Sequence, residues 1–162
     1  MQIRPAELGD AEQIAEIYNR EVLGSTATFD LVPRSIDEQR SWLIERSGAH
    51  AVLVAEADPG VIAGFSSLSP FRSRPAYSTT VESSVYVDQD HRRQGVAREL
   101  MVDLIATAQS HGFHSIMARI ADSQEASLKL HETMGFELVG IERQVGRKFG
   151  RWLDVTVMQV LL

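Results

Sequence analysis

The sequence predicts a single α/β domain in which a mixed β-sheet is layered with helices. Three observations lead to this prediction. Stretches with the two-residue period of strands alternate with stretches of helical period, glycine and proline separate these stretches, and 162 residues are about the length of one domain. The chain has no internal repeat, linker or low-complexity tract. We therefore expect one domain over residues 1–162.

Hydrophobic spacing and capping residues indicate a strand, two helices and a hairpin in the N-terminal part of the chain. The expected elements are a strand around Gln2–Arg4, a helix after the N-cap residue Asp10, a helix from the capping box of Ser35 and Glu38 to about Arg46, and a hairpin of strands Ala51–Ala57 and Val61–Ser69.

The stretch Thr79–Val87 shows the clearest strand pattern, because apolar and polar side chains alternate along it. One face would carry Val81, Ser83, Val85 and Val87, and the other Glu82, Ser84 and Tyr86. A glutamate in the middle of a strand is unusual unless it is paired or functional. Glu82 is therefore either half of a structural salt bridge or a catalytic carboxylate.

The C-terminal part is expected to alternate between helices and strands and to end in a hairpin. The expected elements are a helix from about Gly95 to Ser110, a strand His114–Ala121, a helix Glu125–Met134, and two closing strands, Phe136–Val145 and Leu153–Leu161, joined by a turn at Gly146–Gly150.

Composition excludes several functional classes. Hydrophobic residues make up 44% and charged residues 23% of the chain, which are ordinary globular proportions. A net charge of −6 argues against a sequence-independent nucleic-acid binder. The absence of cysteine excludes disulfides and thiolate metal sites, and we expect no metal. No stretch is apolar enough to span a membrane and no signal peptide is evident, so we expect a soluble, cytoplasmic protein.

A loop between the strand Thr79–Val87 and the next helix has the form of an anion site. The helix begins at or near Gly95, and Gly95 and Ala97 leave the backbone N–H groups of its first turn unshielded. Helix N-termini carry unpaired donors and partial positive charge, which suit a phosphate or pyrophosphate. An ordinary strand–loop–helix connection with a solvated basic loop would have the same spacing.

The segment Arg92-Arg93-Gln94-Gly95-Val96-Ala97 is similar to the Gln/Arg-x-x-Gly-x-Gly/Ala element of the GNAT N-acetyltransferase superfamily. The chain resembles the phosphinothricin and methionine sulfoximine/sulfone acetyltransferases within that superfamily. The segments that carry this resemblance are Ser25–Phe29, Arg72–Tyr77, Thr80–Val87, Ala126–Glu132 with Gly135 and Phe136, and Gly150–Val155. The resemblance implies the GNAT fold, a central mixed and mostly antiparallel sheet flanked by helices, with acetyl-CoA as co-substrate.

The resemblance also implies roles for residues along the presumed acetyl-CoA groove. Glu82 would be the general base, and the backbone N–H near Val87 would face the thioester oxygen, where negative charge develops. Acetyl-CoA would contact Val85, Tyr86, Val87, Arg93, Gln94, Gly95, Val96, Ala97, Arg98, Gln124 and Ser127. Gln124 departs from the asparagine that the family often carries there.

His131 stands where many GNAT enzymes carry a tyrosine beside the thioester sulfur. Its expected catalytic role is general acid to the departing thiolate. A histidine on the surface of the helix or partly buried in it would fit the sequence equally well.

The acceptor would be recognised mainly by arginines, because guanidinium forks match carboxylates and phosphinates. The resemblance implies an acceptor site of Phe29, Arg72, Arg74, Pro75, Ala76 and Tyr77 with Glu82. It also implies a homodimer, in which the strand Leu153–Leu161 could pack at the two-fold interface. Two alternatives stay open: acetylation of a protein N-terminus, a lysine or a polyamine, and a non-catalytic acyl-CoA-binding module.

Overall fold

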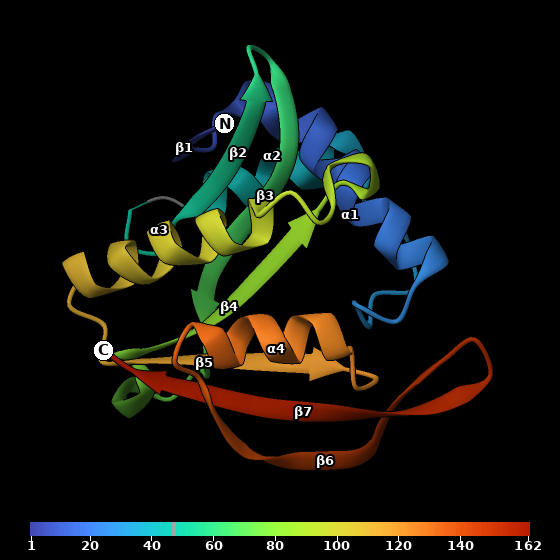
Figure 1. Cartoon of the computed structure of the whole chain (residues 1–162), viewed down its shortest axis with the longest axis vertical. Coiled ribbons are helices and arrows are strands. Elements are labelled where there is room, and N and C mark those ends of the chain that lie inside the picture. Colours follow the sequence, from blue (N-terminus) through green and yellow to red (C-terminus); the bar gives the residue numbers. More distant parts are fainter. Residues whose placement is uncertain (47) are drawn as a thin grey trace.

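A computed structural model describes residues 1–46 and 48–162, which form a seven-stranded sheet of order β1-β2-β3-β4-β5-β7-β6 (Figure 1). The strands are β1 (Gln2–Pro5), β2 (Val52–Asp58), β3 (Val61–Pro70), β4 (Thr80–Val87), β5 (Ser115–Ala121), β6 (Glu137–Lys148) and β7 (Arg151–Leu161). Neighbouring strands are antiparallel except β4 and β5, which are parallel. The mixed, mostly antiparallel sheet is thereby confirmed.

Helices cover both faces of the sheet (Figure 1). They are α1 (Ala11–Gly24), α2 (Ile36–Glu45), α3 (Val96–Ser110) and α4 (Glu125–Thr133). The apolar sides of α3 and α4 pack against strand residues such as Val81 and Ile116 in the larger core. Helix α1 packs with Phe65 and Tyr86 in a second core on the opposite face. The two cores hold β3 and β4 between them.

The helix starts follow the local signals only in part. Ser35 and Glu38 form the expected reciprocal capping box at the start of α2. Asp10 occupies the N-cap position of α1, but its side chain makes no capping bond there. Its carboxylate instead accepts bonds from Arg4, at 2.8 and 2.9 Å, and from the backbone N–H of Glu7. The Asp10 oxygens, which were expected to cap the helix, are therefore bonded to the Arg4 guanidinium instead.

The C-terminal hairpin is longer than the sequence predicts. Strand β6 continues to Lys148 and β7 begins at Arg151, so the turn is Phe149-Gly150 instead of Gly146–Gly150. Gly146 lies inside the strand and pairs with Leu153. A Cβ at Gly146 would lie 2.3 Å from Cε2 of Phe29. This glycine therefore allows the Phe29 ring to pack closely against β6, and it does not form a turn.

Strands β4 and β5 pair over only part of their length. Their register runs from Thr80 opposite Ser115 to Ser83 opposite Ala118, and no pairing continues from Ser84 to Val87. In Figure 1 the two strands diverge beyond this point. The sheet therefore opens between β4 and β5.

No helix in the described part of the chain is both long enough and apolar enough to cross a membrane.

Candidate active site

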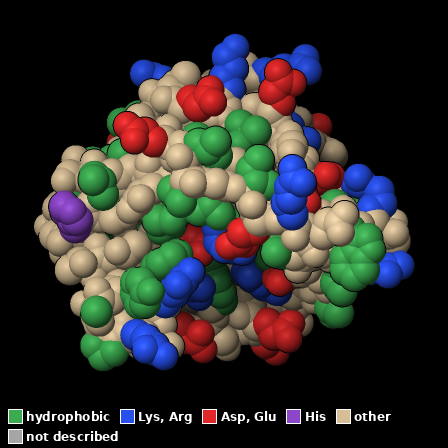
Figure 2. Space-filling view, turned by 90° about the horizontal axis from the view of Figure 1, so that it is seen from below, with side chains coloured by type: hydrophobic (Ala, Val, Ile, Leu, Met, Phe, Trp, Pro, Cys, Tyr) green, Lys and Arg blue, Asp and Glu red, His purple; other side chains and the backbone are tan. Residues whose placement is uncertain are grey.

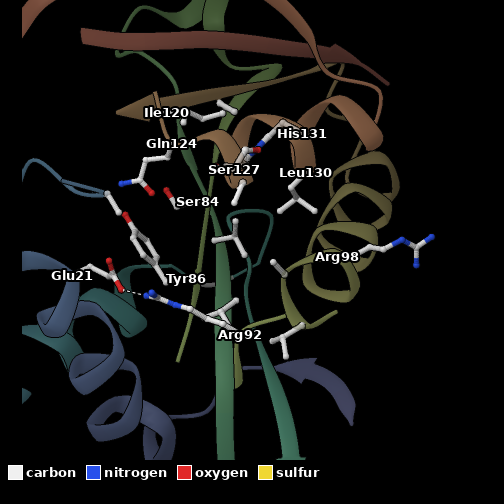
Figure 3. Close-up of a pocket in the computed structure, with 18 of the residues that line it drawn as sticks. Glu21, Ser84, Tyr86, Arg92, Arg98, Ile120, Gln124, Ser127, Leu130 and His131 are labelled. Carbon is white, nitrogen blue, oxygen red and sulfur yellow. Dashed lines mark hydrogen bonds and ion pairs between the residues drawn. The ribbon is translucent and has the colours of Figure 1, made fainter. Parts of the chain in front are cut away.

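A cavity of about 670 Å³ occupies the opening between β4 and β5 and extends to the ends of α3 and α4 (Figure 3). Strand β4 contributes the continuous stretch Ser83–Val87, and β5 contributes Ala118–Ala121. Of the residues expected to contact acetyl-CoA, the cavity is lined by Val85, Tyr86, Val87, Arg93, Gly95, Val96, Ala97, Arg98, Gln124 and Ser127. The structure thus brings these separate segments together around one space.

The backbone of β4 offers unpaired polar groups to this cavity. The N–H of Asp88 donates to Ala63 of β3, and the carbonyl of Thr79 accepts from His114 on the β5 side. Because backbone groups alternate in direction along a strand, the odd-numbered residues of β4 point their N–H and C=O groups toward β5. Beyond Ser83 no β5 partner is present for Val85 and Val87. These groups are free to bond a ligand that lies in the opening.

The first turn of α3 points backbone N–H groups at the same cavity. Gly95 is the N-cap residue with φ of 84°, and no side chain caps the helix. The first intrahelical bond is the one from Glu99 N–H to the Gly95 carbonyl, at 3.1 Å. The N–H groups of Val96, Ala97 and Arg98 come before it and have no acceptor within the helix. This geometry fits the expected anion site.

The polar side chains of this loop are arranged differently from the sequence-based expectation. The Arg98 side chain points away from the cavity, so this residue contributes through its backbone (Figure 3). Gln94, expected at the cofactor, is not among the lining residues, and its amide donates to the Asp90 carbonyl at 3.1 Å. Arg92 reaches across the end of the cavity to form an ion pair with Glu21 of α1 (Figure 3).

Helix α4 presents three polar residues on the other side of the cavity: Gln124, Ser127 and His131 (Figure 3). Gln124 is the N-cap residue of α4 and makes no capping bond, which leaves its amide free. His131 is 4% exposed, and its Nδ1 lies 2.8 Å from the Ser127 carbonyl. A carbonyl only accepts, so Nδ1 carries the proton and Nε2 of the neutral ring has none. Burial lowers the pKa of His131 and favours this neutral form.

Glu82 lies one residue before the lining residue Ser83, on the face of β4 that also carries Ser84 and Tyr86. Burial raises its pKa, while the positive charge of Arg119 lowers it and the negative charge of Glu142 raises it further. A carboxyl whose pKa is raised toward neutrality is a stronger base than an ordinary glutamate. Glu82 makes no salt bridge among the described residues, so the structural alternative for this residue loses its main support.

The expected acceptor residues lie outside the described cavity. Arg72 packs over the rings of Phe71 and Tyr77, and its Nη1 lies 3.4 Å from the Tyr77 hydroxyl. Arg74 is the exposed residue before a single 3-10 turn formed by Pro75, Ala76 and Tyr77. Phe29 packs on Gly146 of the hairpin rather than lining the cavity. Neither this set nor Glu82 is among the lining residues of the cavity between β4 and β5.

Glu21, which lies at the cavity, has no functional signal in the sequence. Glu21, Ser25 and Ala27 line the cavity from the end of α1 and the following loop. Glu21 accepts from the Ser25 hydroxyl at 2.5 Å as well as from Arg92. It thereby links the loop after α1 to the loop before α3. Only the tertiary structure reveals this role, because in the sequence Glu21 is an ordinary polar residue near the end of a helix.

Lys148 fixes the same loop from the opposite side. This lysine is only 4% exposed, and its Nζ donates to the Thr28 carbonyl at 2.9 Å and the Glu21 carbonyl at 3.4 Å. The loop is also bonded through Thr26, whose hydroxyl donates to Asp122 at 2.9 Å. Lys148 and Asp122 therefore hold the segment that carries Ser25 and Ala27 in place.

We expect Lys148→Met to reduce the free energy of unfolding by about 1–3 kcal/mol, because the buried Thr28 carbonyl would lose its donor. Urea denaturation monitored by circular dichroism measures this loss. Lys129→Met is the matched control, since Lys129 is exposed on α4. Equal stability of the two variants would show that the Lys148 contact contributes nothing.

Among the residues that the structure describes, no group of three or more histidine, aspartate or glutamate side chains is placed to hold a metal ion. The cavity instead combines free backbone donors with an uncapped helix N-terminus, and the half-buried carboxylate of Glu82 lies beside its lining residue Ser83. This combination suits a ligand with a phosphate group at one end and amides along its length.

Comparison with known proteins agrees with this geometry. The family model described as "Acetyltransferase (GNAT) domain" matches residues 3–157. An L-amino acid N-acyltransferase from Escherichia coli is 42% identical over 163 residues, covering 100% of this chain and 94% of the relative. An L-methionine sulfoximine/L-methionine sulfone acetyltransferase from Pseudomonas paraeruginosa is 38% identical over 161 residues, covering 99% and 94%.

Solved structures agree as well. A phosphinothricin acetyltransferase from Sinorhizobium meliloti, solved in complex with acetyl-CoA, has a TM-score of 0.96 at 34% identity and covers 99% of this chain and 88% of its own. A ribosomal-protein-alanine N-acetyltransferase from Brucella melitensis has a TM-score of 0.97 at 36% identity, with 100% of both chains covered. The chain belongs to the GNAT acetyltransferase family.

Proposed function

We propose that this enzyme transfers the acetyl group of acetyl-CoA to the α-amino group of a small amino acid or amino-acid analogue of the phosphinothricin or methionine sulfoximine type. The observation that carries the proposal is the joining of two features in one cavity. The opening between β4 and β5 presents free backbone groups, and the uncapped N-terminus of α3 lies beside it. The names of the relatives supply the class of acceptor.

The residues present fit acetyl-CoA. The N–H groups of Val96, Ala97 and Arg98 would bind the pyrophosphate, and Gly95 allows the backbone to approach it closely. The backbone groups of Val85 and Val87 would pair with the pantetheine amides, much as a neighbouring strand would. When bound, acetyl-CoA supplies an activated acetyl thioester at the inner end of this groove.

Glu82 is proposed as the general base. An α-ammonium group has no lone pair, so it must lose a proton before its nitrogen can bond to the acetyl carbon and the carbon–sulfur bond can break. Glu82 lies next to the point where β4 and β5 separate, within the segment that would lie against the thioester. The proton would pass to Glu82 directly or through one water molecule. The N–H near Val87, which the resemblance places at the thioester oxygen, lies five residues beyond Glu82 on β4. That is about 16 Å along an extended strand, so this N–H fits a pantetheine amide better than the thioester.

His131 as a general acid stays a prediction, and its surroundings give it little support. The proton on Nδ1 is engaged by the Ser127 carbonyl, and burial lowers the pKa of the ring. The departing thiolate needs little help, because thiols are much stronger acids than alcohols and a thiolate leaves readily without prior protonation. The position of His131 in the cavity equally suits packing against the thioester with Nε2 as an acceptor.

A second acceptor class has one specific observation in its favour. The ribosomal-protein-alanine N-acetyltransferase from Brucella melitensis is as similar in structure as the amino-acid enzymes. A protein N-terminus presents the same α-amino group without a free α-carboxylate. The acceptor carboxylate therefore distinguishes the two proposals.

A panel of amines tests the proposed function. Release of CoA from acetyl-CoA would be followed with L-methionine sulfone, with the amine that lacks its carboxyl group, and with an alanine-terminated peptide. The proposal expects kcat/KM to be highest for the amino acid. Highest activity on the peptide would favour the second class, and acetyl-CoA binding without turnover of any amine would favour a non-catalytic module.

Arg74→Ala tests the predicted acceptor clamp. If Arg74 binds the anionic group of the acceptor, the variant should raise KM for L-methionine sulfone by about tenfold or more, the equivalent of one charge-assisted hydrogen bond. KM for acetyl-CoA should stay near the wild-type value, because Arg74 lies outside the cavity lining. Unchanged KM for the acceptor would exclude the clamp.

A homodimer and a cytoplasmic location stay predictions. Strand β7, expected at the two-fold interface, lies between β5 and β6 and so offers no free edge. The exposed apolar side chains of the hairpin belong mainly to β6, where Leu138, Val139, Ile141 and Val145 are each more than half exposed. If a dimer forms, β6 is the better candidate for its interface.

A further inference from the structure

A pair of oppositely charged residues lies on the same face of the sheet as Glu82. The parallel register places Glu82 opposite Met117 on β5, and residues two apart on a strand share a face. Arg119 therefore stands on the face of Glu82, beside the point where β4 and β5 separate, and it lines the cavity. No local pattern in the sequence distinguishes Arg119 from other strand residues.

Arg119 is held in place by Glu142 of β6. Its Nη1 donates to Glu142 Oε1 at 2.8 Å, and its Nη2 donates to Oε2 at 2.6 Å. The register explains the contact: Val157 of β7 pairs with both Arg119 and Gly140, and Glu142 follows Gly140 by two residues. The guanidinium thus reaches across β7 and forms a bidentate ion pair with Glu142. Two hydrogen bonds restrict its orientation more than a single bond would.

The other groups that face Glu82 are mostly neutral. Met117 is its partner on β5, and Ser69 is its partner on β3. Ser69 accepts a hydrogen bond at 3.2 Å from Arg46, which follows α2. Arg34 is a further cation on this side of the sheet, and its guanidinium lies 4.0 Å from the centre of the Tyr18 ring, which packs edge-on against Tyr86. Seen from below in Figure 2, the molecule is hollowed at its centre, and acidic and basic side chains gather around the hollow.

We propose that Arg119, oriented by Glu142, is a positioning residue that keeps Glu82 ionised at the pH at which the enzyme works. This inference rests on the proposed role of Glu82 as the base. Burial on a strand face favours the protonated carboxyl, which cannot accept a proton from the acceptor. The fixed positive charge of the guanidinium counteracts this effect of burial. The carboxylate of Glu142 orients that guanidinium and also partly cancels its field at Glu82. The opposite effects of Arg119 and Glu142 on the pKa of Glu82 agree with this arrangement.

The proposal predicts shifts of opposite sign for the two partners. Arg119→Gln removes the cation and leaves Glu142 as a second carboxylate, so the pKa of Glu82 should rise. The acidic limb of kcat/KM for L-methionine sulfone should then move to higher pH by about one unit. Glu142→Gln should move that limb to lower pH. The double variant should return it close to the wild-type position, and Arg119→Lys, which keeps the charge, should shift it least.

Two measurements keep this inference separate from the role of Glu82. Carbon-13 NMR of the side-chain carboxyls, with the Glu82 resonance assigned through Glu82→Gln, follows the charge of Glu82 directly. If the NMR pKa shifts as predicted but the pH–rate profile does not, Glu82 is not the base and the proposed mechanism fails. If the rate profile has a limb that depends on Glu82 but Arg119→Gln does not move it, the inference about Arg119 fails.

Arg40→Gln is the matched control for the loss of one positive charge. Arg40 is exposed on α2 and pairs only with Asp37 of the same helix in the described structure, at 3.6 Å. Its removal should leave the pKa of Glu82 unchanged. Shifts of the same sign for Arg119→Gln and Glu142→Gln would indicate structural disturbance and would also overturn the proposal.

Discussion

Glu82→Gln is expected to lower kcat by about 10²- to 10⁴-fold, the usual contribution of a positioned general base. The amide preserves the volume of the side chain but cannot take the proton of an acceptor ammonium group. Binding of acetyl-CoA should survive, because the expected contacts to it are backbone groups of β4 and α3. Steady-state kinetics and calorimetric titration with acetyl-CoA measure the two properties.

The pH dependence provides a second signature. Burial raises the pKa of Glu82, so wild-type activity should increase as the pH rises through that value and the carboxylate forms. In Glu82→Gln this limb should disappear. The rate deficit should also shrink at high pH, where the acceptor amine arrives already deprotonated.

Glu132→Gln is a suitable control, since Glu132 is exposed on α4 next to the buried His131. It removes one negative charge without touching β4 and should leave kcat unchanged. A Glu82→Gln enzyme with wild-type kcat and an unaltered acidic limb would mean that Glu82 is structural.

Gly95→Val should weaken acetyl-CoA binding by about 10- to 100-fold, the equivalent of losing one charge-assisted hydrogen bond. Gly95 has φ of 84°, a conformation that a β-branched residue adopts only with strain of about 1–2 kcal/mol. Relief of this strain would turn the first N–H groups of α3 away from the pyrophosphate. A Cβ at this position would meet no protein atom within 4 Å, so the loss would come from the backbone and from the ligand.

Gly112→Val separates binding from stability. Gly112 follows the other end of α3 with φ of 78°, and its Cβ would also meet no atom within 4 Å. Both variants should therefore lose similar stability, measured by thermal denaturation, but only Gly95→Val should lose acetyl-CoA affinity, measured by calorimetry. Equal affinities of the two folded variants would contradict the placement of the pyrophosphate at α3.

Features that depend on neighbouring residues could be predicted from the sequence. The capping box of Ser35 and Glu38 and the start of α3 at Gly95 were predicted because their signals lie within one helical turn. The alternation along β4 placed Glu82, Ser84 and Tyr86 on one face because the strand period is two. The predicted position of the hairpin turn was wrong, because Gly146 has the appearance of a turn glycine in the sequence. The structure shows that this glycine instead leaves room for the ring of Phe29.

The sequence by itself determined most of the strands and helices, the glycine at the start of α3 and the position of Glu82 on β4, since each follows from local periodicity or capping. Only the tertiary structure decided how far β4 and β5 stay paired, and therefore where the sheet opens. It also decided the partners of Asp10, Lys148 and Arg119, which bond to groups distant in sequence or to backbone carbonyls. Such pairings depend on the order of strands in the sheet, which a local pattern does not specify.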